Sequence, residues 1–173
     1  STITMQLVKN IFLRREKTLA RKIQEVLLTW WIESVMDKRD ILELYLNVIE
    51  YGPGVYGIRN GARHYFNRLP GQLSPAESVY LATILPNPKR YHASFERGAV
   101  SPAWTEIMRK QLVRLGERGS YTAQAVAYGL HELSAFHFVP EGHLVDARQI
   151  TASAAPLPYE RRFAPDADWQ DEG

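Results

Sequence analysis

The stretch Ser1-Thr-Ile-Thr-Met-Gln-Leu-Val-Lys-Asn10, followed by Arg21-Lys-Ile-Gln-Glu25, carries most of the information in this sequence. Six lysines and arginines fall between Lys9 and Lys22, against the single acid Glu16. The carboxylate of Glu25 comes next, on a strongly apolar segment. Cations that can hold phosphate groups, close to a carboxylate that apolar neighbours shield, indicate chemistry on a phosphorylated substrate.

Composition limits the classes of protein that this chain can belong to. With 173 residues, 45% of them hydrophobic, the chain is long enough for one domain with a real core, which excludes disorder throughout. A net charge of +2 is too small to indicate nucleic acid as a partner. The absence of cysteine excludes disulfides, zinc-thiolate sites and thiol nucleophiles. The chain begins at Ser1 without Met and has no signal peptide, so we expect a targeting or anchoring segment upstream.

Helical periodicity runs through most of the chain. It predicts helices over residues 4–13, 19–36, 38–47, 55–66, 75–85, 102–118 and 120–133. Thr18, Asp37 and Ser101 are expected to cap three of them, and Ser74 with Glu77 forms a capping box for a fourth. The prediction is a mostly α fold with one domain over residues 1–139 and a Pro-rich, acidic tail over residues 140–173.

The second predicted helix is apolar on nearly every side. Residues 26–32 read Val-Leu-Leu-Thr-Trp-Trp-Ile, and such a run is typical of a buried helix. The stripe that we expect to face the core consists of Leu19, Ile23, Val26, Leu27 and Trp30. We also expect Trp30 and Trp31 to be core residues.

Glu25 admits two interpretations. It shares a helical stripe with Leu28 and Ile32, where loss of solvent raises a carboxyl pKa unless a cation compensates. Arg21 and Lys22 lie one turn before it, so the alternative is a surface ion pair worth only ~0.3–0.5 kcal/mol. Periodicity alone favours the surface pair, and the basic residues upstream shift the balance toward a site.

The basic residues themselves allow three interpretations. Lys9, Lys17, Arg21 and Lys22 could come to one side and clamp a diphosphate, with Lys as a point charge and Arg as a bidentate fork. They could instead be a solvated polar face, which we prefer for Arg14 and Arg15, or a patch that contacts anionic lipid head groups.

Two other patterns carry no site. Residues 52–57, Gly-Pro-Gly-Val-Tyr-Gly, match the letters of a dinucleotide-binding fingerprint, but a predicted helix and not a strand precedes them. We therefore interpret them as a turn that allows a close approach of the backbone. The five histidines have no metal-site spacing, so the sequence predicts no metal site.

Several motifs in order resemble those of the peptidoglycan glycosyltransferases, the domains that polymerise lipid II in bifunctional penicillin-binding proteins and monofunctional transglycosylases. Residues 1–10 resemble the family's Gly-Gly-Ser-Thr-Ile-Thr-Gln-Gln-Leu-Val-Lys-Asn, and residues 21–25 its Arg-Lys-x-x-Glu. Residues 38–47 resemble its Lys-x-x-Ile-Leu-Glu-x-Tyr-Leu-Asn. Further matches at residues 52–57, 65–66, 73–77 and 85–88 extend the likeness over about residues 1–92.

This resemblance implies a lysozyme-like helical fold on the outer, periplasmic face of the bacterial cytoplasmic membrane, in peptidoglycan biosynthesis. The 4-hydroxyl of lipid II attacks the growing glycan, and undecaprenyl diphosphate leaves. Glu25 is implied as the second catalytic carboxylate, near the diphosphate. The residues implied or predicted to bind substrate are Ser1, Thr2, Gln6, Lys9, Lys17, Arg21 and Lys22, and those that support the cleft are Glu43, Tyr45 and Asn47.

The implied partners are lipid II, undecaprenyl-linked glycan, the membrane surface and other cell-wall synthesis proteins, with no nucleic acid. No cofactor is required, and a divalent cation that assists the diphosphate is left open. No transpeptidase signature follows, so we do not expect penicillin binding.

The chain departs from the family pattern at three places. Lys17 stands where an Arg is common, and Met5 replaces a Gln. The family's general-base Glu belongs to a motif that precedes the one at Ser1, and this sequence does not contain it. Since loss of a general base costs ~10²–10⁴ in rate, we expect this chain alone to be inactive or nearly so.

Two alternatives to a polymerase stay open. One is a non-catalytic cell-wall scaffold that kept the cleft. The other is a lysozyme-like glycan hydrolase, which has little need for cations that bind a diphosphate and should tolerate charge reversal at Lys9 and Arg21.

Overall fold

The computed structural model describes residues 2–11 and 18–140 of the chain. Ser1, Lys17 and the predicted tail from residue 141 onward lie outside these residues. The described part consists of α1 (Ile3–Ile11), α2 (Leu19–Val35), α3 (Lys38–Val48), β1 (Glu50–Gly52), β2 (Val55–Tyr56), α4 (Ile58–Phe66), α5 (Pro75–Ile84), α6 (Pro88–Glu96), α7 (Pro102–Glu117) and α8 (Ala123–Glu132), with short 3₁₀ turns at Pro70–Gln72 and Leu133–Ala135. The prediction of a mostly α fold is confirmed.

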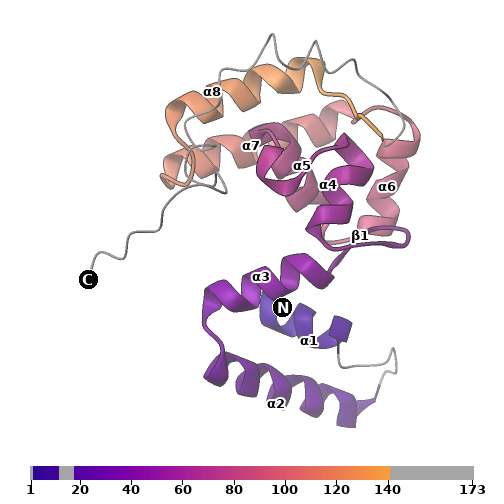
Figure 1. The fold of residues 1–173 in the computed structure, drawn as a ribbon, viewed down its shortest axis with the longest axis vertical. Helices are drawn as coiled ribbons and strands as arrows, with labels where there is room; N and C mark the ends of the chain where they lie inside the picture. The colour runs from indigo at the N-terminus through magenta and orange to yellow at the C-terminus, as the bar shows by residue number, and fades with distance from the viewer. Residues whose placement is uncertain (1, 12–17, 141–173) are drawn as a thin grey trace.

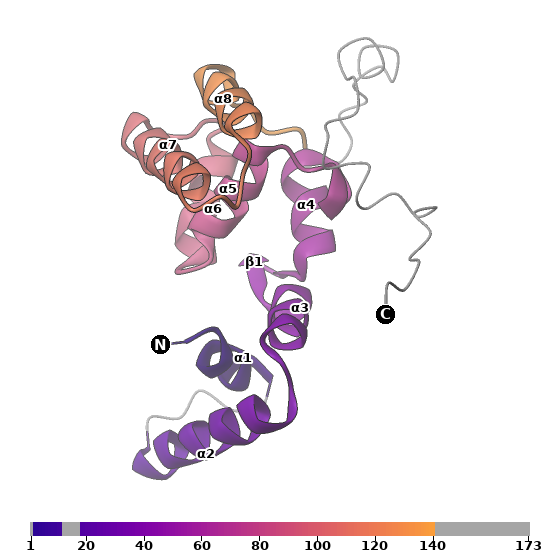
Figure 2. The ribbon, with the colours of Figure 1, turned by 90° about the vertical axis from the view of Figure 1, so that its left-hand side faces the viewer.

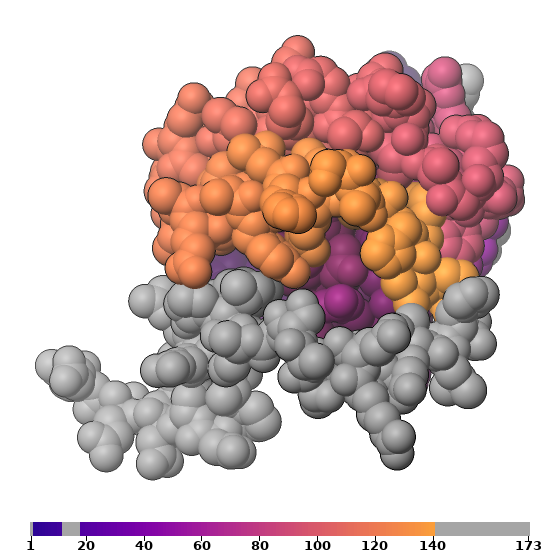
Figure 3. Space-filling view, turned by 90° about the horizontal axis from the view of Figure 1, so that it is seen from above, coloured from indigo at the N-terminus to yellow at the C-terminus, as the bar shows by residue number. Residues whose placement is uncertain are grey.

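The helices form two groups. Figure 1 shows α1, α2 and α3 together at one end of the molecule, and α4 to α8 at the other. The view at right angles in Figure 2 shows the same separation, with β1 between α3 and the larger group. Seen from above, α7 and α8 form the outer surface of the larger group (Figure 3). The described site residues of the opening motifs belong to the smaller group.

The helix starts predicted at Thr18, Asp37, Ser74 and Ser101 are confirmed, and each rests on a local hydrogen bond, whereas the last helix begins at Ala123 and not at residue 120 as predicted. The hydroxyl of Thr18 accepts from the backbone N–H of Arg21, and the carboxylate of Asp37 accepts from two N–H groups of α3. Ser74 and Glu77 form the reciprocal capping box, with Pro75 in the first turn of α5. These contacts satisfy N–H groups that a helix start leaves without partners.

The burial predicted for α2 is wrong. Its buried residues are Glu25 and Ile32, while the stripe expected to face the core is exposed. Leu19 is 79% exposed and Trp30 71% exposed, and Trp31 is also exposed rather than in the core. At 100° per residue, Glu25 and Ile32 lie on the side of the helix opposite to that stripe. α2 therefore packs through its weaker apolar stripe and presents its stronger one to the outside.

The helix predicted over residues 55–66 is broken at its start. Val55 and Tyr56 pair with β1 in an antiparallel hairpin, and α4 begins only at Ile58. Gly54 in the turn and Gly57 at the start of α4 both have positive φ, which glycine adopts without strain. The prediction that residues 52–57 form a turn is thereby confirmed.

The core of the larger group is rich in aromatic rings. Tyr65 and Phe66 of α4 pack against Tyr80 of α5, with ring centroids 5.5 and 5.9 Å apart. Phe136 and Phe138, which follow α8, close this cluster, and the N–H of Val139 donates to the carbonyl of Tyr65 at 3.0 Å. The chain up to residue 139 thus packs onto the domain.

Helix α6 was not predicted. The helix predicted over residues 75–85 ends before Pro86-Asn87-Pro88, and Asn87 caps α6 by accepting from the N–H of Arg90. A histidine pair attaches α6 to α4, with 3.0 Å between the Nε2 atoms of His64 and His92. His92 Nδ1 lies 3.2 Å from Glu96, so these histidines have structural contacts, as expected.

Candidate functional site

The site is organised around α1, which two buried residues hold in place. Leu7 and Val8 are fully buried against α2 and α3. Thr2 precedes the helix, and its hydroxyl accepts from the N–H of Met5 at 3.2 Å, so it acts as the N-cap. With this face of α1 fixed, Gln6 and Lys9 lie one turn apart and close to the neighbouring helices.

Glu25 is the centre of the predicted site, and the structure brings two of its predicted cations to it. Its Oε1 lies 3.3 Å from Nζ of Lys9 on α1 and 3.3 Å from Nζ of Lys22 on α2. The Glu25 residue is 0% exposed, whereas the Lys9 and Lys22 side chains are 38% and 55% exposed. The carboxylate therefore lies directly beneath two ammonium groups that solvent can still reach.

The charge state of Glu25 follows from this pairing. Burial alone raises the pKa of the carboxyl group, but the hydrogen bonds and charges of Lys22 and Lys9 outweigh burial and hold its pKa below the ordinary value. Glu25 is consequently an anion at neutral pH. Its second oxygen, Oε2, is buried and has no hydrogen-bond partner in the described part of the chain.

Arg21 belongs to the same side of α2 as Glu25. It lies four residues before Glu25, one helical turn away, and is half-buried. Of the four cations predicted to come to one side, Lys9 and Lys22 meet at Glu25, Arg21 lies on the same side of α2, and Lys17 lies outside the described residues. Lys9 and Lys22, the two cations that pair with Glu25, exceed its charge by one.

Tyr45 links α3 to Gln6. The Tyr45 hydroxyl donates to Oε1 of Gln6 over 2.8 Å, and the Tyr45 residue is 4% exposed. Burial raises the pKa of Tyr45, so the phenol keeps its proton and acts as a donor. Sequence reasoning placed Tyr45 as a support of the cleft but did not identify the residue that it supports.

The other two residues predicted to support the cleft make local contacts. Glu43 and Asn47 are exposed on α3, and the Asn47 side chain donates to the backbone carbonyl of Glu43 at 2.9 Å. Ser1 and Lys17 lie outside the described residues. No group of three or more metal-ligating side chains occurs within residues 2–11 and 18–140.

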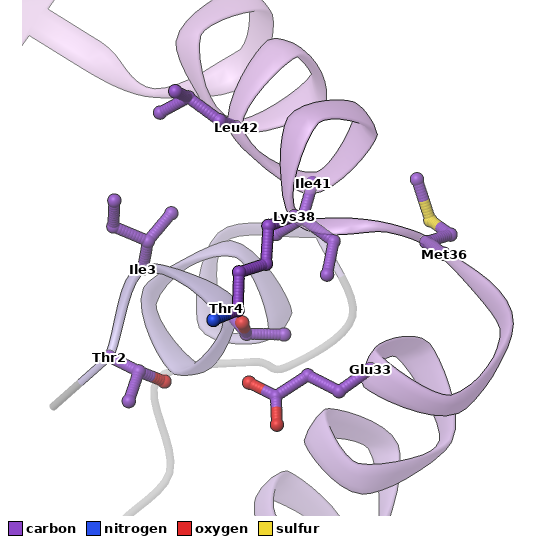
Figure 4. Close-up of a pocket in the computed structure, with 8 residues that line it drawn as sticks. All are labelled: Thr2, Ile3, Thr4, Glu33, Met36, Lys38, Ile41 and Leu42. Carbon is purple, nitrogen blue, oxygen red and sulfur yellow. The ribbon is translucent and has the colours of Figure 1, made fainter.

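A separate groove of about 520 Å³ opens at the far ends of these helices. Its lining residues are Thr2, Ile3, Thr4, Glu33, Met36, Lys38, Ile41 and Leu42. Figure 4 shows the side chains of Glu33 and Lys38 extending toward Thr4 over a mostly apolar wall. Neither Lys9 nor Glu25 lines this groove, so it is distinct from the charged cluster.

Comparison with known proteins identifies related sequences over the part of the chain that holds the cluster. The family described as transglycosylase matches residues 1–112. A biosynthetic peptidoglycan transglycosylase of Nitrosomonas europaea is 52% identical over 53% of this chain and 37% of its own length. Proteins of the same name from Aromatoleum aromaticum (52% identical over 55% of this chain and 41% of the relative) and Azoarcus sp. (47% identical over 62% and 50%) are similar. The chain thus spans half or less of the length of these curated relatives.

Proposed function

Because this chain belongs to the transglycosylase family, we propose that it takes part in polymerising lipid II into peptidoglycan glycan strands, with release of undecaprenyl diphosphate. The observation that carries this proposal is the arrangement of Lys9 and Lys22, whose ammonium groups each lie 3.3 Å from the buried carboxylate of Glu25. A cationic surface with a fixed shape is what a lipid-linked diphosphate needs as a binding site.

The reaction requires charge neutralisation where the leaving group departs. The acceptor's 4-hydroxyl oxygen bonds to C1 of the donor sugar, and the bond from C1 to the diphosphate oxygen breaks. Undecaprenyl diphosphate leaves with the electron pair, and the hydroxyl proton passes to a base. The ammonium groups of Lys9 and Lys22 face the buried Glu25 and are still reached by solvent, so they can stabilise the negative charge that develops on the departing diphosphate.

Glu25 serves in this proposal as an anchor for the cations. A carboxylate paired with two ammonium groups is a poor base, since its pKa is lowered. Its negative charge instead fixes Lys9 and Lys22 side by side and offsets their mutual repulsion. We assign the remaining predicted substrate contacts to Gln6 and Arg21, which lie on the same helices. A divalent cation bound with the diphosphate stays part of the proposal.

The test is a lipid II polymerisation assay on the protein encoded by the complete reading frame. We expect glycan strands and released undecaprenyl diphosphate. Shortened glycan from added peptidoglycan would indicate the hydrolase instead. Neither product, from a folded protein that binds peptidoglycan, would indicate the scaffold.

We further propose that the outer face of α2 contacts the membrane surface, on the periplasmic side of the cytoplasmic membrane. None of the helices in the described ranges has the length and hydropathy needed to cross a bilayer. The exposed apolar residues that support the contact are Leu19, Ile23, Val26, Leu27, Trp30, Trp31 and Val35. Tryptophan favours the level of the lipid head groups, and such a face lies flat in the interface rather than spanning it.

A double substitution tests this contact. We expect Leu27→Ser with Trp30→Ser to weaken partition onto phosphatidylglycerol vesicles about tenfold or more, because each side chain contributes ~1.5–3 kcal/mol when buried. The matched control is Ile107→Ser with Tyr128→Ser, two exposed apolar residues on α7 and α8. Co-sedimentation measures both variants, and equal losses of binding would overturn the assignment to α2.

A further inference from the structure

The Gln6 amide is held by one end only. Its Oε1 accepts the Tyr45 hydroxyl hydrogen bond, 2.8 Å long, which joins α1 to α3 across 39 positions of sequence. Among the described residues, no hydrogen bond from the Gln6 Nε2 group accompanies this contact. An amide offers one acceptor oxygen and two N–H donors, so occupation of the oxygen leaves the donors for a ligand.

The direction of this hydrogen bond is fixed by the environment of Tyr45. The residue is 4% exposed, and its hydroxyl has the Gln6 oxygen as its partner. A phenol can donate or accept, but donation to the Gln6 oxygen gives the proton of this hydroxyl its partner, and it places the amide oxygen toward α3 and the nitrogen away from it. An unheld amide would present its oxygen and its nitrogen with similar frequency.

Gln6 lies one helical turn before Lys9 on α1. Lys9 in turn reaches the carboxylate of Glu25, which also pairs with Lys22. A ligand oxygen held by Lys9 therefore comes within reach of the Gln6 amide donors. We propose that Tyr45 is a positioning residue that fixes the Gln6 amide as a hydrogen-bond donor, so that this end of the site binds a phosphoryl oxygen. The identity of the ligand rests on the proposed function. The orientation of the Gln6 amide by the Tyr45 hydroxyl does not depend on it.

The chain offers a matched control. Tyr51 and Tyr80 are also buried, but their hydroxyls have no hydrogen-bond partner in the described part of the chain. Tyr80→Phe thus removes a phenol oxygen from a packed site without removing a side-chain contact. Tyr45→Phe makes the same chemical change and removes the bond to Gln6. A difference in ligand affinity or in the Gln6 signals between the Tyr45→Phe and Tyr80→Phe variants therefore measures the effect of the hydrogen bond from Tyr45 to Gln6.

The experiment is NMR of the Gln6 side-chain amide, titrated with farnesyl diphosphate. In the free wild-type chain we expect one ordered amide signal pair, which Tyr45→Phe renders mobile and Tyr80→Phe leaves unchanged. We expect Tyr45→Phe to weaken farnesyl diphosphate affinity about five- to thirtyfold, the loss typical of one positioned hydrogen bond to a charged ligand. In a Gln6→Ala background Tyr45→Phe should have no further effect on affinity.

The outcomes are distinguishable. If the Gln6 amide signals of the Tyr45→Phe variant match those of the wild type, the positioning role is overturned. It is also overturned if Tyr45→Phe lowers the affinity for farnesyl diphosphate equally in the wild-type and the Gln6→Ala backgrounds. A third outcome is a wild-type chain that shows an ordered Gln6 amide and yet does not bind farnesyl diphosphate. That result would support the orientation of Gln6 by Tyr45, but it would overturn both the ligand assigned here and the proposed function.

Discussion

Glu25→Gln lowers the rate of lipid II polymerisation by about 10²–10³, the range found when a preorganised electrostatic group is removed from a transition state. The substitution preserves the shape of the side chain but removes the charge that lies 3.3 Å from both Lys9 and Lys22. The two ammonium groups then repel each other and turn to solvent. The measurement is initial polymerisation rate with the protein of the complete reading frame.

The control for this prediction is Glu33→Gln, an exposed carboxylate two turns further along α2 that lines the separate groove. It should leave the rate within about twofold, because surface carboxylates contribute little. Circular dichroism melts of both variants check that the fold persists. A Glu25→Gln protein that folds and polymerises lipid II like the Glu33→Gln protein would remove Glu25 from the site.

Gly57→Ala lowers the free energy of unfolding by about 2–4 kcal/mol, from a strained positive φ and a steric clash together. Gly57 has φ +80°, and a Cβ atom there would lie 2.6 Å from the backbone carbonyl oxygen of Asn47. That oxygen belongs to α3 and cannot move without shifting the junction between the two groups of helices. The measurement is chemical denaturation followed by circular dichroism.

Gly54→Ala separates the two causes. Gly54 has φ +75°, but a Cβ atom there meets nothing within 4 Å. This variant should therefore lose only the conformational cost, about 1–2 kcal/mol. Equal losses of stability in the two variants would show that the close approach of Gly57 to Asn47 contributes nothing.

Local signals in the sequence correctly predicted the helix starts for which a cap was identified. Thr18, Asp37 and Ser74 lie next to the N–H groups that they satisfy, so the relevant distance is three residues or fewer. These local signals did not predict α6. Pro86-Asn87-Pro88 ends α5 and also begins α6, and the sequence pattern predicted the end of α5 but not the start of α6. A helix start and a helix stop can share the same residues when the connection is this short.

Hydrophobicity alone could not predict which face of α2 is buried. Its strongest apolar stripe is exposed, and the side that packs carries Glu25. An apolar stripe shows only that its residues avoid water, and both a protein core and a lipid surface offer that environment. The contact between Lys9 and Glu25 depends on how α1 crosses α2, which no local pattern in residues 1–25 determines. The resemblance to a family, not periodicity, placed these residues in one site.

The affinity for lipid II of a Lys9→Met, Lys22→Met double variant tests the central claim most directly. If these two ammonium groups hold the lipid-linked diphosphate, the affinity falls by about 100-fold or more and depends less on salt, since each charged contact contributes ~1.5–3 kcal/mol. The control is Lys89→Met with Lys110→Met, which removes two exposed lysines that also pair with glutamates. Equal affinity of the two folded double variants for lipid II would contradict the account.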